Sequence, residues 1–207
     1  MTKRVGKWLV IAFALVGVAT VAGALVLLSS GISARPDPSA FEAAVAGRLR
    51  ALAIPSSAQN LRNPLSVNDE VIEEGMAHWA DHCALCHANN GDGQTEIGRG
   101  LYPRAPDMRL PATQELSDGT LFYIIENGVK LTGMPAWATG TPEGERESWK
   151  LVHFIRQLPE LTPEQIERMD AMNPRSPESS SEEEEIRRFL EGGAPKPGTK
   201  RKHGGHE

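Results

Sequence analysis

Two cysteines and a histidine form the most chemically specific motif in the sequence. Cys83-Ala84-Leu85-Cys86-His87 contains both cysteines of the 207-residue chain. This Cys-x-x-Cys-His spacing is typical of a c-type haem, because both thiols can form thioethers to one macrocycle and the adjacent imidazole can bind its iron. The sequence therefore predicts one covalent haem c, attached through Cys83 and Cys86, with His87 as an iron ligand.

Other uses of this motif receive less support. A thioredoxin-like redox pair would lie between a strand and a helix, and no strand pattern surrounds the cysteines. A zinc site would need further ligands at short spacing, and the chain has no second cysteine pair. His78 and His82 are four residues apart, which suits a metal, but without a third ligand we interpret them as surface or packing residues.

A closed coordination sphere needs a second axial ligand, commonly Met or His. Of the six methionines, Met134 follows His87 by 47 residues and lies in a predicted loop between a glycine and a proline. Met76 lies on the predicted helix that leads into the haem motif, and Met108 lies beside the proline-rich stretch 103–106. Met1, Met169 and Met172 lie outside residues 67–160, so Met134 is the predicted ligand. A ligating histidine usually donates its other ring N–H to a carbonyl, and Pro106 is our first candidate, with Pro103 second.

The elements that must position these residues are predicted to be helices. Apolar residues recur every three or four positions in the segments that begin near residues 40, 69, 117 and 142. The second segment is capped by Ser66 or Asn68 and runs into the haem motif. Its Gly75 predicts a close crossing with the helix that ends near residue 158, and its Met76 and Trp79 are predicted core residues. Glycines are expected to keep the loop after His87 flexible.

An apolar stretch of 21 uncharged residues, 8–28, follows the basic segment 1–7. As a helix it would extend about 31 Å, enough to cross a bilayer. The basic flank predicts a cytoplasmic N-terminus and an exported remainder, which fits because bacteria attach haem outside the inner membrane. The alternative is a signal peptide cleaved near Ile32-Ser33-Ala34. We favour a retained anchor, since secretory apolar regions usually span about 7–15 residues.

The rest of the chain divides into a linker with a short amphipathic helix (29–66), a domain (67–160), and a helical extension with a disordered tail (161–207). Residues 67–160 carry 15 acidic and 7 basic side chains. This balance disfavours nucleic acid and favours redox protein partners with basic docking patches. His203 and His206 could bind copper or nickel weakly, but we interpret the tail as solvated.

Over residues 67–160 the chain resembles the membrane-anchored monohaem class I c-type cytochromes of bacteria. The matching pieces are the haem motif, Asn90-Gly91-Asp92-Gly93, the stretch 103–106, the line from Asn127 to Trp137 with Met134-Pro135, and the closing helix 149–158. Ala88 departs from the family's usual glycine, and we expect the turn there to be tightened differently. The resemblance implies an all-α class I cytochrome c fold around one haem, with one ring edge near solvent, preceded by a single transmembrane helix.

These features predict an electron carrier and no catalytic residues, since two axial ligands leave no open site on the iron. The expected function is one-electron transfer between respiratory-chain partners on the periplasmic side of a bacterial inner membrane. One alternative is a cytochrome c subunit of a larger dehydrogenase or oxidase. The other is a haem enzyme or gas sensor with a labile sixth ligand.

Overall fold

Two helices that cross at a glycine form the centre of the structure. The computed structural model describes residues 2–30, 33–174, 187 and 190, and every regular element within them is helical. Helix α4 (Asp69–His78) crosses α9 (Pro142–Gln157) at Gly75, where an added Cβ would lie 2.6 Å from the Lys150 carbonyl oxygen. The close crossing expected from Gly75 is therefore confirmed.

The core lies around this crossing. Trp79 and Phe154 pack with ring centroids 5.8 Å apart, and both are almost fully buried together with Met76. The expectation that Met76 and Trp79 are core residues is confirmed. Trp149 packs on the other side of α9, stacked on Phe122 at a centroid separation of 4.1 Å. Aromatic rings thus fill much of the space between the helices.

The helix boundaries follow short-range capping signals. Asn68 accepts a hydrogen bond from the Val71 N–H at 2.8 Å, so it caps α4, and the Ser66 alternative is wrong. Helix α8 (Asp118–Asn127) has the predicted Ser117 cap and ends at Gly128, whose φ is 66°. Each cap satisfies an N–H or carbonyl group that the helix leaves without an internal partner.

Four short elements lie around the core. Helix α6 (Glu96–Gly100) lies in the segment expected to be a flexible loop, and α7 (Pro111–Gln114) follows the proline-rich stretch. A 3-10 turn, η2 (Leu158–Glu160), links α9 to α10 (Pro163–Asp170). Helix α10 joins the core through Met169, which is fully buried, while Asp170 accepts a 2.6 Å hydrogen bond from Asn89.

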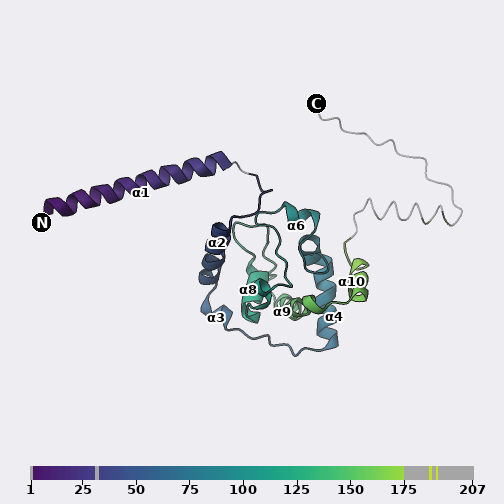
Figure 1. The fold of residues 1–207 in the computed structure, drawn as a ribbon. Coiled ribbons are helices and arrows are strands. Elements are labelled where there is room, and N and C mark those ends of the chain that lie inside the picture. The colour runs from purple at the N-terminus through teal and green to yellow at the C-terminus, as the bar shows by residue number, and fades with distance from the viewer. Residues whose placement is uncertain (1, 31–32, 175–186, 188–189, 191–207) are drawn as a thin grey trace.

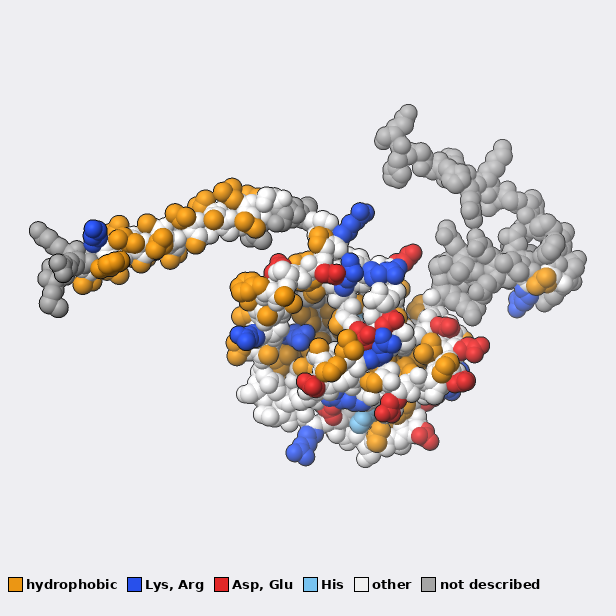
Figure 2. Space-filling view, viewed as in Figure 1, with side chains coloured by type: hydrophobic (Ala, Val, Ile, Leu, Met, Phe, Trp, Pro, Cys, Tyr) orange, Lys and Arg blue, Asp and Glu red, His pale blue; other side chains and the backbone are white. Residues whose placement is uncertain are grey.

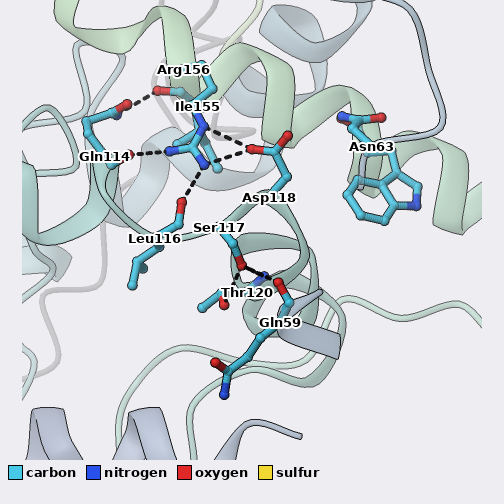
Figure 3. Close-up of polar contacts among 10 residues, drawn as sticks. Gln59, Asn63, Gln114, Leu116, Ser117, Asp118, Thr120, Ile155 and Arg156 are labelled. Carbon is cyan, nitrogen blue, oxygen red and sulfur yellow. Dashed lines mark hydrogen bonds and ion pairs between the residues drawn. The ribbon is translucent and has the colours of Figure 1, made fainter. Parts of the chain in front are cut away.

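The segment before α4 is attached to the domain at several points (Figure 3). Helix α2 (Ala40–Ala53) is followed by α3 (Ser56–Gln59), which packs on α8. The Ser117 hydroxyl donates to the Gln59 carbonyl at 2.7 Å. The Asn63 amide donates to the Trp149 carbonyl at 2.8 Å. The carbonyl of Leu65 lies 2.9 Å from His153 Nε2. These bonds hold the linker against α8 and α9.

Helix α1 (Thr2–Ser30) leads away from the other helices, as Figure 1 shows. Its stretch Val5–Val26 has a mean hydropathy of 2.6 and makes no buried contact, so by length and composition it could cross a membrane. A signal sequence would meet the same criterion. Most of the predicted helical extension and tail (161–207), including His203 and His206, lies outside the described residues, as does Ile32 of the alternative cleavage site.

Candidate functional site

The cysteine motif lies where the helix that begins as α4 changes its winding. After His78 the chain forms a π-helical turn, η1 (Trp79–Cys83), and then a short helix, α5 (Ala84–His87). A π-turn adds one residue to a helical turn and so rotates everything after it around the axis. The apolar periodicity predicted an uninterrupted α-helix here, which is wrong. The extra residue changes the direction in which the cysteines and His87 leave the helix.

Both cysteines are free thiols in an apolar setting. Part of the Cys83 side chain remains accessible, yet burial, aided by neighbouring Cys86, raises the pKa of its thiol to about 12. Burial also raises the pKa of Cys86. A thioredoxin-like pair needs a thiolate with a lowered pKa, so the direction of both shifts disfavours that use. Among the described residues, no three His, Cys, Asp or Glu side chains gather into a metal site, which leaves the zinc alternative without a donor set.

The half-buried ring of His87 packs against Trp79 and lies beside the backbone of a distant loop. Its ring lies against Trp79 at a centroid distance of 5.7 Å. Nδ1 is buried and makes no well-aligned hydrogen bond. Burial lowers the pKa of His87, and the nearby Pro106 carbonyl partly opposes this effect. The imidazole is therefore held neutral, and the Pro106 carbonyl lies beside its ring.

The turn after His87 depends on an alanine in an unusual conformation. Ala88 has φ 61° and ψ 160°, a combination that side chains rarely adopt. The expectation that the turn would avoid a positive φ at this position is wrong. The Ala88 carbonyl accepts a 3.1 Å hydrogen bond from the indole of Trp79, and the His87 carbonyl accepts one of 2.9 Å from the Gly93 N–H. These bonds hold the strained residue in place.

Glycines bring the following loop close to the motif. A Cβ on Gly98 would collide with the Cys86 carbonyl, which also accepts a 3.2 Å hydrogen bond from the Thr95 hydroxyl. A Cβ on Gly93 would collide with the Ala105 carbonyl. Gly98 therefore serves close packing, and the expectation that it keeps the loop flexible is wrong.

Main-chain hydrogen bonds place Pro106 beside His87. The Ala105 N–H donates to the Gly98 carbonyl at 3.0 Å, and the Met108 N–H donates to the Gly91 carbonyl at 2.8 Å. Pro106 thus lies between Ala105 and Met108, whose N–H groups are both hydrogen-bonded to the glycine-rich loop. This arrangement is of the kind that orients a ligating histidine through its second nitrogen.

Met134 lies in a loop that is fastened to the end of α8. Its carbonyl accepts a 3.1 Å hydrogen bond from the Val129 N–H, and its own N–H donates to the Thr132 hydroxyl at 3.1 Å. The Trp137 N–H donates to the Ile125 carbonyl at 3.0 Å. The loop therefore has a defined backbone although Met134 itself is only half-buried.

The other described methionines have packing roles. Met76 and Met169 are buried in the core, and Met108 and Met172 pack against it. Met134 is outside this cluster. Its thioether is thus the one among the described methionines that the core does not use.

Two contacts connect the Met134 loop to other parts of the domain. A Cβ on Gly133 would lie 2.5 Å from a Leu101 methyl, so the Met134 loop touches the segment that leads to Pro106. On another side the ring of Trp137 packs edge-on against His82, 5.4 Å between centroids. The Met134 loop is therefore linked both to the proline segment and to the helix that carries the cysteine motif.

The histidine pair outside this site has local partners. His78 Nδ1 lies 3.7 Å from Glu147, and His82 Nδ1 lies 3.1 Å from Asp81. Their rings are 4.9 Å apart. They line an open surface groove together with the buried Lys150, which pairs with Glu74 and Glu147. These contacts agree with the interpretation of both histidines as surface and packing residues.

The central part of the chain also matches a known protein family. The model for the family described as cytochrome c oxidase, cbb3-type, subunit III matches residues 70–155. These residues form a c-type cytochrome domain. The predicted all-α class I cytochrome c fold is confirmed, and the domain implies electron transfer by a bound haem c. A search of curated proteins found no match to the chain.

The residues present suit that group. Two thiols, a half-buried neutral imidazole and a thioether outside the core form a donor set appropriate for a covalent haem. Nδ1 of His87 is buried, and the Pro106 carbonyl lies beside the ring. No described residue is hydrogen-bonded to Nε2, which leaves this nitrogen available for iron.

Proposed function

We propose that the chain is a one-electron carrier in which Cys83 and Cys86 would hold one haem c covalently, and His87 Nε2 and Met134 Sδ would bind its iron. The observation that carries this proposal is the neutral, oriented imidazole of His87 next to two free thiols. When bound, the haem supplies a reversible ferric–ferrous couple. Pro106 would fix the ring and its tautomer, because an imidazole that uses Nε2 as a ligand carries its proton on Nδ1.

The Met134 loop would supply the second ligand with little reorganisation. Its backbone is closed by bonds within the loop and tied to α8 by the Trp137–Ile125 bond, so the thioether would not need to be recruited from a packed core. A thioether ligand favours the ferrous state more than a second imidazole would, and raises the potential. With His87 and Met134 both bound, these residues would leave no site for a substrate at the metal, so the domain would act as an electron carrier.

We further propose that α1 anchors the domain on the periplasmic side of a bacterial inner membrane. The length and apolarity of Val5–Val26 and the basic residues before it support this arrangement. The excess of acidic side chains in residues 67–160 would favour transient docking to basic patches on redox partners. Anchoring would raise the effective concentration of the domain near membrane complexes.

The axial ligands can be tested by replacing one methionine at a time. We expect the full-length wild-type chain, extracted in mild detergent, to have a low-spin haem c spectrum. Met134→Ala should keep the covalent haem but change the ferric form to high spin and admit carbon monoxide or cyanide readily. Met108→Ala, a matched control at the edge of the core, should stay low-spin. An unchanged spectrum in Met134→Ala would mean that another residue is the ligand.

The attachment sites and the rival with a labile ligand are tested in the same preparation. Cys83→Ala combined with Cys86→Ala should abolish haem staining on denaturing gels. A high-spin wild-type protein that binds carbon monoxide at once would support an enzyme or gas sensor and reject the carrier.

A second candidate function is a fixed subunit of a larger oxidase complex. The family match over residues 70–155 favours it, since the matched family is described as an oxidase subunit. The chemistry of the haem would be the same and only the partner would differ. Purification in mild detergent tests it: stoichiometric co-purification of other subunits supports a complex, whereas a chain that elutes alone supports a diffusing anchored carrier.

A further inference from the structure

Helix α2 is fixed at both ends but buries none of its own residues. Its apolar positions follow one stripe, and their exposed fractions are 77% for Phe41, 40% for Val45, 61% for Leu49 and 82% for Leu52. A stripe of this kind normally lies against another apolar surface. None of the described helices packs closely on this stripe.

The N-terminal end of α2 is attached to the loop that precedes Pro106. Tyr102 Oη donates to Glu42 at 3.3 Å. Just before the helix, Arg104 pairs with Asp37 at 3.0 Å and donates to the Arg35 carbonyl at 3.1 Å. Residue 101 of the same loop touches Gly133 beside Met134. This end of α2 therefore meets the site from the side where the proline and methionine loops converge.

The C-terminal end is attached through α3 to α8. Ile54, the residue after α2, is only 6% exposed. The Gln59 amide donates to the Ala51 carbonyl at 3.2 Å and to the Ile54 carbonyl at 2.8 Å. Because Gln59 is itself bonded to Ser117, α2 spans between α8 and the proline loop.

The orientation of α2 follows from Glu42. At 100° per residue, Leu49 lies roughly 20° and Val45 roughly 60° around the helix from Glu42, whereas Ala44 lies roughly 160° away. Since Glu42 contacts Tyr102, Val45 and Leu49 belong to the side of α2 that faces the domain. Figure 2 shows hydrophobic side chains around a hollow between α2 and the rest of the domain.

We propose that the stripe of α2, with Leu49 on the edge nearest Glu42, forms one wall of the haem pocket and shields the macrocycle from water. This inference rests on the proposed function, since it needs a haem at Cys83 and Cys86. Glu42, whose position shows which side of α2 faces the domain, is hydrogen-bonded to Tyr102 in the loop next to the site. Both ends of α2 are bonded to segments that border the site. A haem presents a large apolar surface, so it suits a stripe that none of the described helices covers.

A membrane surface is the main competing occupant, because α1 ends only nine residues before α2 begins. The bond between Glu42 and Tyr102 argues against it, since it turns Leu49 toward the domain. The two arrangements differ in what a charge at position 49 would do. Next to the haem, this charge would change the midpoint potential of the iron. Against a membrane, it would leave the midpoint potential unchanged.

The test compares the haem midpoint potential of full-length Leu49→Asp with that of Ala44→Asp, both in detergent. The same charged side chain is introduced on opposite faces of one helix. We expect Leu49→Asp to lower the midpoint, because added water and negative charge stabilise the ferric state. An effect of up to about tenfold in the reduction equilibrium, or about 59 mV for one electron, is expected. Ala44→Asp should match wild type.

Equal potentials in the two variants would overturn the inference and favour the membrane surface or another partner for α2. If Leu49→Asp does not accumulate, Leu49→Thr provides the same comparison against Ala44→Thr, with a smaller expected decrease. A wild-type chain that takes up no haem would instead refute the proposed function, so the two failures are distinguishable.

Discussion

The Gly75 crossing makes a quantitative prediction about stability. In Gly75→Ala the new methyl would lie 2.6 Å from the Lys150 carbonyl oxygen, 3.0 Å from its carbon and 3.1 Å from Phe154 Cβ. Two of these atoms are backbone, so no side chain can rotate away, and α4 and α9 must separate. Lys150 is also held in place, because its buried ammonium pairs with Glu74 and Glu147.

Overpacking of this kind costs about 1–3 kcal/mol. The higher helix propensity of alanine offsets roughly 1 kcal/mol of this cost. We therefore expect Gly75→Ala to lower the free energy of unfolding by about 1–2 kcal/mol. For a domain of this size each kcal/mol lowers the Tm by about 4–8 °C. Thermal and urea unfolding followed by far-UV circular dichroism would measure both quantities on the haem-loaded protein.

Gly47→Ala is the matched control. Gly47 is also inside a helix, but no heavy atom lies within 4 Å of the position that its Cβ would occupy. This variant should be as stable as wild type or slightly more stable. A Gly75→Ala protein that unfolds at or above the wild-type temperature would refute the close crossing, and with it the way the haem motif is placed against α9.

Two further predictions concern the turn after His87 and the histidine pair. Ala88→Gly should stabilise the domain by about 1 kcal/mol in urea unfolding, because the strain of a φ of 61° exceeds the added chain entropy of glycine. His78→Gln should make stability less sensitive to acid. Burial, with repulsion from His82, lowers the pKa of His78, against a weaker opposing effect of Glu147. The unfolded chain, with a pKa of about 6.5, therefore binds the proton more readily, and wild type loses stability as the pH falls below about 6.5.

Urea midpoints at several pH values between neutral and mildly acidic conditions would test the His78 prediction. A variant that loses as much stability as wild type over this range would contradict the assigned cause. For the turn, an Ala88→Gly protein less stable than wild type would show that the alanine methyl contributes more through packing than its backbone conformation costs.

The helices that the sequence predicts well are those whose signals are local. Ser117 and Asn68 bond to N–H groups three residues ahead, and Gly128 ends a helix through its own backbone conformation. The apolar spacing in α9 likewise reports its buried face directly. Such features depend on residues within one or two turns, so they can be read without knowing the fold.

Sequence patterns do not predict the features that depend on contacts with distant segments. The π-turn at Trp79 does not follow from the apolar spacing, which is compatible with an unbroken α-helix. Gly98 resembled a flexible loop residue, but its role is set by the Cys86 carbonyl, twelve positions earlier in the chain. The burial of Met169 in the core could not be read from its own helix alone.

The sequence by itself determined the chemistry that this chain can carry out. The spacing of Cys83, Cys86 and His87 indicates a covalent haem, because thioether attachment requires that order of groups. Tertiary structure decided how these groups are supported: which proline carbonyl faces His87, which methionine the core leaves unused, and where α2 lies. The reason is physical. Covalent chemistry depends on neighbours along the chain, whereas orientation and shielding depend on contacts between segments that only folding brings together.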